Sequence, residues 1–364
     1  MTRELDRTSD ASRELTSGKP RGAWRRAAGE RILIVGTGRL VADIVQEFSA
    51  RSRPSTIVGI VSDGTIESTL RGWPQASLDR LDDVLERTRP TRIIVDPDRW
   101  NGSLPITPFL DAQAAGVIVE DAVAAYERLT GKAYLEALTL APRHVVFSAP
   151  FQSSRLQELW ARALSVVAAI AGLVALAPLF VVLAILIKLD SSGPVLFVQE
   201  RLGRRGKPFS LLKFRTMHPV TDERSQWRGD NANRVTRVGR LLSRCRLDEL
   251  PQLVNLLRGD MDLVGPRPHP LSNVEQFQFK EKIECYALRL LVRPGITGWA
   301  QVRYKYADNL EEEREKMRYD LYYIKHRSVK LDVRIVLSTL RAVMHGSGVE
   351  SAEASPERPV RRAA

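Results

Sequence analysis

The amino-acid sequence predicts an α/β protein built from a doubly wound α/β domain, a long apolar helix and a second, basic domain. Apolar strand-like runs alternate with helical patterns between residues 29 and 150, an alternation typical of parallel α/β sheets. Residues 163–187 then contain no charged side chain, and the chain beyond Asp190 is rich in arginine and lysine. These three observations divide the chain into its expected parts.

The first domain opens with a strand, a glycine turn and a helix. The segment "RILIVGTGRLVADIVQEF", from Arg31, is a continuous apolar run, then a turn with two glycines, then apolar residues at helical spacing. The pattern of apolar run and helical segment continues along the domain. Strands are expected at residues 55–63, 91–98 and 116–120, and helices at "LDRLDDVLERT" and "PFLDAQAA".

The glycine turn raises the question of a bound nucleotide. Gly36 and Gly38 supply the first two glycines of the dinucleotide-binding fingerprint, and Asp63 ends the second strand about where a ribose-binding acid stands. The third glycine position holds Val41, however, and a lone glycine turn is often only a tight turn. We keep Gly36, Gly38 and Asp63 as candidate nucleotide ligands. They also motivate a competing function, an NAD-dependent oxidoreductase, which leaves the apolar helix unexplained.

Residues 163–187 predict a membrane-associated helix. At 1.5 Å per residue the helix reaches about 37 Å, enough to cross a hydrocarbon core of about 30 Å. Arginine and lysine flank both of its ends, so the charge pattern gives a single span no preferred orientation. Pro178 stands near the middle, where it removes a backbone hydrogen bond and bends a helix. We therefore favour a re-entrant helix, with both neighbouring domains in the cytoplasm, over a transmembrane span.

Composition narrows the range of partners. The 364 residues carry a formal net charge of +12, which predicts an acidic partner: nucleic acid, an anionic membrane surface or a phosphorylated substrate. The basic residues cluster around carboxylates and glycine turns rather than along one helix. A non-enzymatic nucleic-acid or scaffold protein therefore ranks last, and no nucleic-acid partner is expected. The two cysteines stand in no disulfide or metal-binding pattern.

The two ends of the chain differ from its middle. Residues 1–28 lack the apolar core of a secretory signal and are expected to form a disordered basic arm. Residues 350–364 are expected to be a disordered tail.

Asp248 and Glu249, in "RLDELPQLVNLLRGDMDLVGPRP", are the candidate catalytic residues. As structure, they would cap a short helix that Pro251 helps to start. As chemistry, they are a carboxylate nucleophile and a Mg²⁺ ligand. An aspartate is ionised without a general base, but attack on a diphosphate requires cations that neutralise the phosphoryl oxygens. The flanking sequence supplies such cations: Arg240, Arg244, Arg246, Arg258 and Arg267.

The segment from about residue 160 to residue 349 resembles the bacterial sugar transferase family. These are monotopic phosphoglycosyl transferases that move a sugar 1-phosphate from a UDP-sugar to a polyprenyl phosphate. The resemblance rests on six blocks in order: "IKLDSSGPVLFVQERLG", "KPFSLLKFRTM", "RVTRVGRLL", "LDELPQLVNLLRGDMDLVGPRP", "LVRPGITGWAQV" and "YDLYYIKHRSVKLDVRIVLSTL". Larger members of the family carry a similar Rossmann-like module.

This resemblance implies the order of the domains and their surroundings. It implies a Rossmann-like doubly wound domain over residues 29–150, a linker and re-entrant membrane helix over residues 151–189, and a small, mostly helical α+β catalytic domain over residues 190–349. It implies the cytoplasmic face of the bacterial inner membrane as the location. The implied partners are a UDP-sugar such as UDP-glucose, undecaprenyl phosphate and membrane lipids. A homo-oligomer is left open.

The resemblance also assigns roles to the carboxylates. Asp248 attacks the β-phosphate of the UDP-sugar, releases UMP and carries the phosphosugar until undecaprenyl phosphate takes it. Glu249 matches the family's Mg²⁺-associated glutamate, so Mg²⁺ is the expected cofactor. The reaction would be the first membrane step in the synthesis of an exopolysaccharide or related glycan.

The sequence departs from the family at one basic position near the dyad. Five residues before the aspartate, relatives commonly carry an arginine, where this chain has Ser243 and two nearby arginines as candidate substitutes. The phosphate-binding residues that the resemblance implies, with these substitutes, are Lys213, Arg215, Arg244, Arg246 and Arg267.

Overall fold

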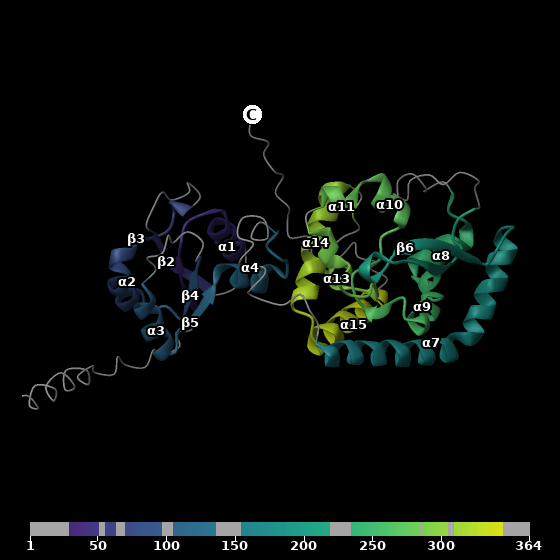
Figure 1. Cartoon of the computed structure of the whole chain (residues 1–364), viewed down its shortest axis with the longest axis horizontal. Coiled ribbons are helices and arrows are strands. Elements are labelled where there is room, and N and C mark those ends of the chain that lie inside the picture. Colours follow the sequence, from purple (N-terminus) through teal and green to yellow (C-terminus); the bar gives the residue numbers. More distant parts are fainter. Residues whose placement is uncertain are drawn as a thin grey trace, which may run out of the picture. The chain divides into compact units, whose positions relative to one another are not determined.

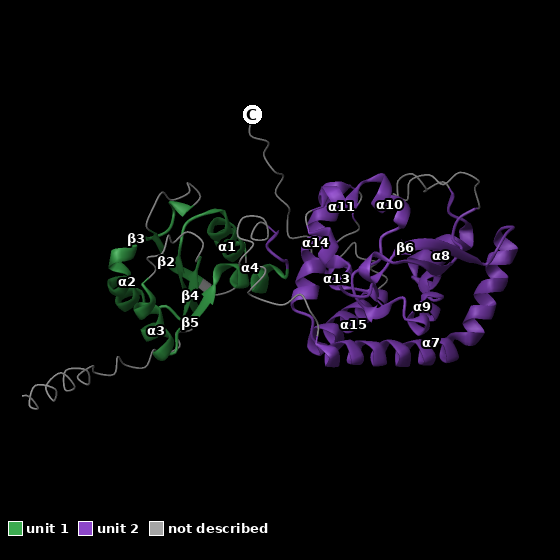
Figure 2. Ribbon diagram, viewed as in Figure 1, with its two compact units in different colours: residues 1–131 green, residues 132–364 purple. Residues whose placement is uncertain are grey.

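The computed structural model describes residues 29–50, 55–62, 70–96, 105–135, 154–218, 234–283, 285–304, 307 and 309–344. The chain forms two compact units, residues 1–131 and residues 132–364, which Figure 2 colours separately. The predicted arm and tail lie outside the described residues. So do Asp63 and residues 136–153, where the predicted boundary between the first two domains falls.

A parallel β-sheet forms the centre of unit 1, which confirms the expected α/β class. Its five strands lie in the order β3-β2-β1-β4-β5, and every neighbouring pair is parallel (Figure 1). Because β1 is central, the chain winds outward from it in two directions. Each expected strand forms within three residues of its predicted ends. The strands are β1 (Glu30–Val35), β2 (Ser55–Ser62), β3 (Gln75–Ser77), β4 (Arg92–Val95) and β5 (Ile118–Asp121).

Helices pack on this sheet because β1 is apolar on both faces. Leu33 and Val35 belong to a buried cluster that side chains of α2 and α3 complete. Ile32 and Ile34 alternate with them, so they point to the other face, and they are as fully buried. The helices of unit 1 are α1 (Arg39–Ser49), η3 (Leu78–Arg80), α2 (Leu81–Thr88), α3 (Ile106–Ala114) and α4 (Ala122–Thr130).

The predicted apolar helix is α7 (Arg155–Asp190). Ser154 and Gln157 form a capping box at its start: the Ser154 hydroxyl accepts the Gln157 backbone N–H, and the Gln157 side chain accepts the backbone N–H of Ser154. In Figure 1, α7 runs along one edge of unit 2 and then changes direction sharply. Pro178 lies inside the helix and is the residue that bends it.

Small residues on one face of α7 allow this helix to pack closely against the rest of unit 2. Ala161, Ser165 and Ala169 recur every fourth residue and are buried. Gly172 continues this stripe, since a Cβ there would lie 2.9 Å from Leu253 Cδ1 of α9. Leu183 and Ile187 are buried in the second half of the helix, and many of its other apolar side chains, among them Val167, Ile170, Val174 and Val181, are exposed. Its most apolar 18-residue window has a mean hydropathy of 3.0 and is 11% buried, so by length and composition the helix is able to cross a membrane.

Short elements build the remainder of unit 2. An antiparallel hairpin joins β6 (Leu196–Leu202) to β7 (Pro208–Phe214), and a parallel pair joins β8 (Asp262–Val264) to β9 (Gly295–Thr297). The helices are η5 (Arg204–Gly206), α8 (Arg237–Arg244), η7 (Leu247–Glu249), α9 (Gln252–Arg258), α10 (Leu271–Gln276), α11 (Phe279–Lys282), α12 (Tyr286–Arg289), α13 (Trp299–Arg303), α14 (Leu310–Lys325) and α15 (Val329–Met344).

The core of unit 2 includes residues that precede α7 in the sequence. Ala133 and Leu135 are buried in the same cluster as Tyr286 and Tyr323. The Ala133 N–H donates to the Arg318 carbonyl of α14 at 2.8 Å. Residues 132–135, which the sequence assigns to the first domain, therefore pack in unit 2.

Candidate active site

The dyad lies in the short connection between α8 and α9. Asp248 and Glu249 are the last two residues of η7. Arg246 precedes this turn with φ at 55°, a left-handed conformation that ends α8 and redirects the chain. The N-cap positions of η7 and α9 are Arg246 and Pro251, and neither makes a side-chain cap bond. The prediction that Asp248 caps its helix is therefore wrong, because the left-handed residue starts the turn two positions before it.

Apolar side chains hold this turn against the second half of α7. Leu247 and Leu250, on either side of the dyad, pack into a cluster with Phe180 and Phe214. The two phenylalanine ring centroids are 5.4 Å apart. The part of α7 that follows Pro178 therefore forms an apolar floor beneath the dyad.

Two cations neutralise Glu249. The Arg267 guanidinium donates to both carboxylate oxygens of Glu249, at 2.5 and 3.2 Å, in a bidentate pair. Lys213 Nζ lies 3.6 Å from Glu249 Oε1. Burial by itself raises the pKa of Glu249, but Arg267 and Lys213 outweigh it and hold the pKa well below its usual range. Glu249 is therefore ionised throughout the neutral range.

Asp248 has a different electrostatic environment from its neighbour. Burial raises its pKa, Lys213 opposes this shift, and the charge on Glu249 adds to it. Two adjacent carboxylates with pKa values shifted in opposite directions are suited to separate tasks. The first ionises less readily than an ordinary aspartate, and the second is a fixed anion.

Lys213 reaches the dyad from the β6–β7 hairpin. It is opposite Phe197 in the antiparallel register, and Arg201 is opposite Phe209, so Lys213 and Arg201 lie on one face of the hairpin. Burial is the main cause that lowers the pKa of Lys213 to about 8; the charges of Arg267 and Arg201 act in the same direction, and the charge of Glu249 opposes them. Arg201 is not among the residues predicted from the sequence, although the alternate spacing of residues in two consecutive strand-like runs could have placed it beside Lys213.

The other predicted phosphate-binding arginines lie in different surroundings. Arg215 is buried, and its guanidinium donates to the carbonyls of Ser191 and Ser192, each at 2.7 Å, just after the end of α7. Arg244 is exposed in the last turn of α8. The charge of Arg246 helps to lower the pKa of Glu249. The structure thus gathers Lys213, Arg246 and Arg267 around the dyad and directs Arg215 into a structural contact.

The candidate nucleotide residues of unit 1 stand at the end of β1. Gly36 and Gly38 both have positive φ, at 135° and 154°. A Cβ on Gly36 would lie 2.7 Å from the Cβ of Asp96, at the end of β4. Val41, at the third glycine position, is fully buried in α1. Asp63 lies outside the described residues.

The carboxylates of the dyad fit a metal ion only together with a substrate. In the part of the chain that the structure describes, no group of three or more His, Cys, Asp or Glu side chains is arranged to hold a metal. Mg²⁺ in phosphoryl-transfer sites is usually held by one or two carboxylates plus substrate phosphates and water. Asp248 and Glu249 offer such a set.

Comparison with known proteins identifies the family of the segment that contains this site. The bacterial sugar transferase family matches residues 156–346, the part of the chain that holds α7, the hairpin and the dyad. The chain belongs to this family.

Three relatives show how far the likeness extends. A UDP-N-acetylgalactosamine-undecaprenyl-phosphate N-acetylgalactosaminephosphotransferase of Aeromonas hydrophila is 44% identical over 51% of this chain and 44% of its own length. UDP-glucose:undecaprenyl-phosphate glucose-1-phosphate transferases of Escherichia coli K12 and Caulobacter vibrioides are 40% and 45% identical, over 57% and 51% of this chain and 44% and 70% of their own lengths. The chain thus spans less than half the length of the first two.

Proposed function

We propose that this protein transfers a sugar 1-phosphate from a UDP-sugar to undecaprenyl phosphate. The single observation that carries the proposal is the dyad: a half-buried aspartate beside a glutamate that is paired with Arg267 and lies 3.6 Å from Lys213 Nζ. A carboxylate nucleophile, a fixed anion and converging cations are what attack on a diphosphate requires. Family membership and the printed names of the relatives agree with this reaction.

The first step is nucleophilic attack by Asp248. A carboxylate oxygen of Asp248 forms a bond to the β-phosphorus of the UDP-sugar, and the bond from that phosphorus to the bridging oxygen breaks. UMP leaves with the bond's electron pair, and the sugar phosphate stays on Asp248 as an acyl phosphate. Lys213 and Arg267, which both lie against Glu249, would neutralise the phosphoryl oxygens and so lower the repulsion between the anionic carboxylate and the anionic diphosphate.

The second step returns the enzyme to its starting state. A phosphate oxygen of undecaprenyl phosphate attacks the same phosphorus, and the bond to Asp248 breaks with its electron pair on the carboxylate. No proton transfer to or from the nucleophile is needed, since both the attacking and the leaving groups are anions. Mg²⁺, held by Glu249 and the substrate phosphates, would add positive charge at the phosphoryl oxygens.

The acceptor substrate is a lipid, so the site must lie near a membrane. We propose that α7 enters and leaves the bilayer on one side, bent at Pro178, and that both units are cytoplasmic. The apolar floor beneath the dyad supports this arrangement, because it connects the reacting carboxylate to the exposed apolar surface of α7. Single-cysteine variants of a chain without Cys245 and Cys285 should label in both units from the cytoplasmic side only. Labelling from opposite sides would establish a transmembrane span.

Release of UMP tests the reaction. Purified full-length protein with Mg²⁺, undecaprenyl phosphate and a panel of UDP-sugars, including UDP-glucose and UDP-N-acetylgalactosamine, should release UMP with at least one donor. The relatives differ in their sugar, so the panel also identifies the donor. Without the lipid acceptor, mass spectrometry should find a phosphosugar on the peptide that contains Asp248. Absence of UMP with every donor would reject the proposal.

A further inference from the structure

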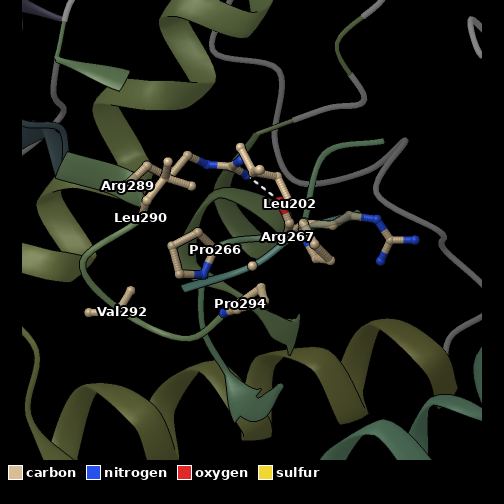
Figure 3. A pocket seen from close by; sticks show the side chains of 9 residues that line it. Leu202, Pro266, Arg267, Arg289, Leu290, Val292 and Pro294 are labelled. Atoms are coloured by element: carbon tan, nitrogen blue, oxygen red, sulfur yellow. Dashed lines mark hydrogen bonds between the residues drawn. The ribbon is translucent and has the colours of Figure 1, made fainter. Parts of the chain in front are cut away.

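The backbone of the loop that carries Arg267 packs closely against β9: the Gly295 N–H donates to the Pro266 carbonyl at 3.0 Å. Gly265 lies so close to Gly295 that a Cβ on Gly295 would be 2.1 Å from the Gly265 nitrogen. Pro266 and Pro268 restrict the backbone torsions on both sides of Arg267. Figure 3 shows that the Arg267 side chain extends away from the other residues of the adjoining small pocket. The position of the guanidinium therefore depends on where this loop is held.

Arg289 connects the Arg267 backbone to α14. One terminal nitrogen of the Arg289 guanidinium donates to the Arg267 carbonyl, the contact drawn as a dashed line in Figure 3. Its Nε donates to Asp320 Oδ2 of α14 at 2.8 Å. The Arg289 and Asp320 side chains are each 3% exposed, so water does not compete for these bonds. The chain of contacts runs from Asp320 through Arg289 and Arg267 to Glu249.

A second buried carboxylate of α14 anchors the same loop. Glu313 precedes Asp320 by seven residues, two helical turns, so the two carboxylates lie on one face of the helix. Glu313 Oε2 lies 3.2 Å from His269 Nε2, and His269 Nδ1 lies 2.9 Å from the Tyr286 hydroxyl. The buried face of α14 thus supports the loop between β8 and α10.

We propose that Asp320, acting through Arg289, is a positioning residue that sets the Arg267 guanidinium against Glu249. This inference rests on the proposed function, since Arg267 matters only if the dyad handles phosphates. Asp320 touches neither the dyad nor, by its burial, any substrate. The Asp320 carboxylate fixes the orientation of the Arg289 guanidinium. This guanidinium in turn fixes the backbone carbonyl of Arg267, the residue that neutralises Glu249.

The alternative is that the Arg289–Asp320 pair serves only folding. A buried ion pair is weak evidence of stabilisation, because desolvation offsets the attraction of the charges, and apolar residues of similar volume often replace such pairs without loss of stability. Removing one partner, by contrast, leaves an unpaired buried charge. The informative variant therefore replaces both, as Arg289→Met with Asp320→Leu, and keeps the core filled.

A double-mutant cycle with Arg267→Ala separates positioning from folding. The pair variant should lower kcat for UMP release about tenfold or more in the wild-type background, as displacement of a charged site residue does. In the Arg267→Ala background the same pair variant should lower kcat less than about twofold, because the group it positions is already absent. Asp320→Asn alone should follow the same pattern if it folds. Equal losses in both backgrounds would overturn the proposal.

Two further measurements make the outcome unambiguous. The same cycle is measured on equilibrium binding of UMP with Mg²⁺ by calorimetry, which needs no turnover. Failure of the wild-type protein to release UMP would reject the proposed function, whereas UMP binding that weakens equally with and without Arg267 would reject the positioning role. Arg314→Lys is the matched control. Arg314 lies on α14, as Asp320 does, and donates to a backbone carbonyl, as Arg289 does. Its acceptor is the carbonyl of Lys282 in α11, at 2.8 Å, rather than the loop that carries Arg267, so kcat should change less than about twofold.

Discussion

The dyad turn of unit 2 and the glycine turn of unit 1 are the two motifs that stand out in the sequence, and they lie in different structural surroundings. At the dyad, Lys213 arrives from a hairpin and Arg267 from a distant loop, and both contact Glu249. At the glycine turn, Gly36 packs against the backbone and Cβ of Asp96, and its N–H donates to the Val61 carbonyl at 2.8 Å. The first motif gathers charge from remote segments, whereas the second packs against the ends of neighbouring strands.

This difference shows why we propose a reaction for the dyad and not for the glycine turn. Glycines are required wherever the backbone must pass close to another chain segment, with or without a ligand. Carboxylates are likewise common at helix starts, whether or not they take part in a reaction. The dyad differs from such motifs because cations from separate elements of the chain are directed at one carboxylate, that of Glu249, although burial of these charges is unfavourable.

Loss of the nucleophile should have the largest effect on turnover. We expect Asp248→Asn to lower kcat for UMP release by about 10³-fold or more, because an amide cannot form the acyl phosphate. The thermal unfolding midpoint should be unchanged or higher, since burial of the Asp248 carboxylate is unfavourable, as its raised pKa indicates. Turnover within tenfold of wild type would show that the dyad, like the glycine turn, is only structural.

Substitutions of Arg267 and Arg215 should distinguish a contact with the dyad from a contact with the end of α7. Arg267→Ala removes the bidentate partner of Glu249, so we expect kcat/KM for the UDP-sugar to fall about 10²-fold. Arg215→Lys loses part of the fork that donates to Ser191 and Ser192, so it should lower the unfolding midpoint and change kcat/KM only about twofold. Steady-state kinetics and calorimetry on the same preparations test both. The reverse ranking would place Arg215 at the phosphates.

Acidification should weaken unit 2 through the network that supports Arg267. Burial and the Arg289 charge lower the pKa of His269 to about 3 from 6.5, so between these values the unfolded chain binds a proton that the folded chain does not. The free energy of unfolding should therefore fall as pH decreases from about 6.5 towards 3 and should not change above 6.5 through this group. Glu313, whose pKa is held below its usual range, acts in the same direction below about 4.5. Calorimetry should give a midpoint several degrees lower at pH 5 than at pH 7.5, with a smaller difference in His269→Gln. A midpoint that rises on acidification would contradict this sign.

A change at the glycine turn should have the smallest effect on turnover. Gly36→Ala adds a Cβ at φ 135°, 2.7 Å from the Cβ of Asp96, so we expect it to destabilise unit 1 by about 1–3 kcal/mol. UMP release should stay within about twofold of wild type, because the dyad and its cations all belong to unit 2. Val41→Ala, which removes apolar side-chain contacts without backbone strain, is the control. A tenfold loss of turnover in Gly36→Ala would mean that the glycine turn takes part in the reaction.

Much of the fold follows from local pattern. Four of the five strands of unit 1 are predicted apolar runs, whereas the short β3 is polar, and α7 extends beyond the predicted apolar run by eight residues at its start and three at its end. Short elements were less predictable. The dyad was expected in a helix cap, but the left-handed Arg246 placed it in a separate turn, and a positive φ at an arginine has no signature in the sequence.

The candidate site was predictable only in part, because similar residues reach different partners. Lys213 and Arg215 stand two positions apart in one block, and a continuing strand would present both on the same face. β7 ends at Phe214, however, so Lys213 points to Glu249 while Arg215 follows the chain back to the end of α7. The roles of Arg201, Arg289 and Asp320 depend on contacts across tens of residues, which no local pattern records.

The sequence by itself determined the parallel sheet, the long apolar helix, its proline and the adjacency of Asp248 and Glu249, because side-chain periodicity, hydropathy and covalent neighbourhood are local properties. The tertiary structure decided which cations surround the dyad and which of the two carboxylates they neutralise. Electrostatic interaction depends on distance and burial, and both are set only when the hairpin, the proline loop and α14 pack together around the turn.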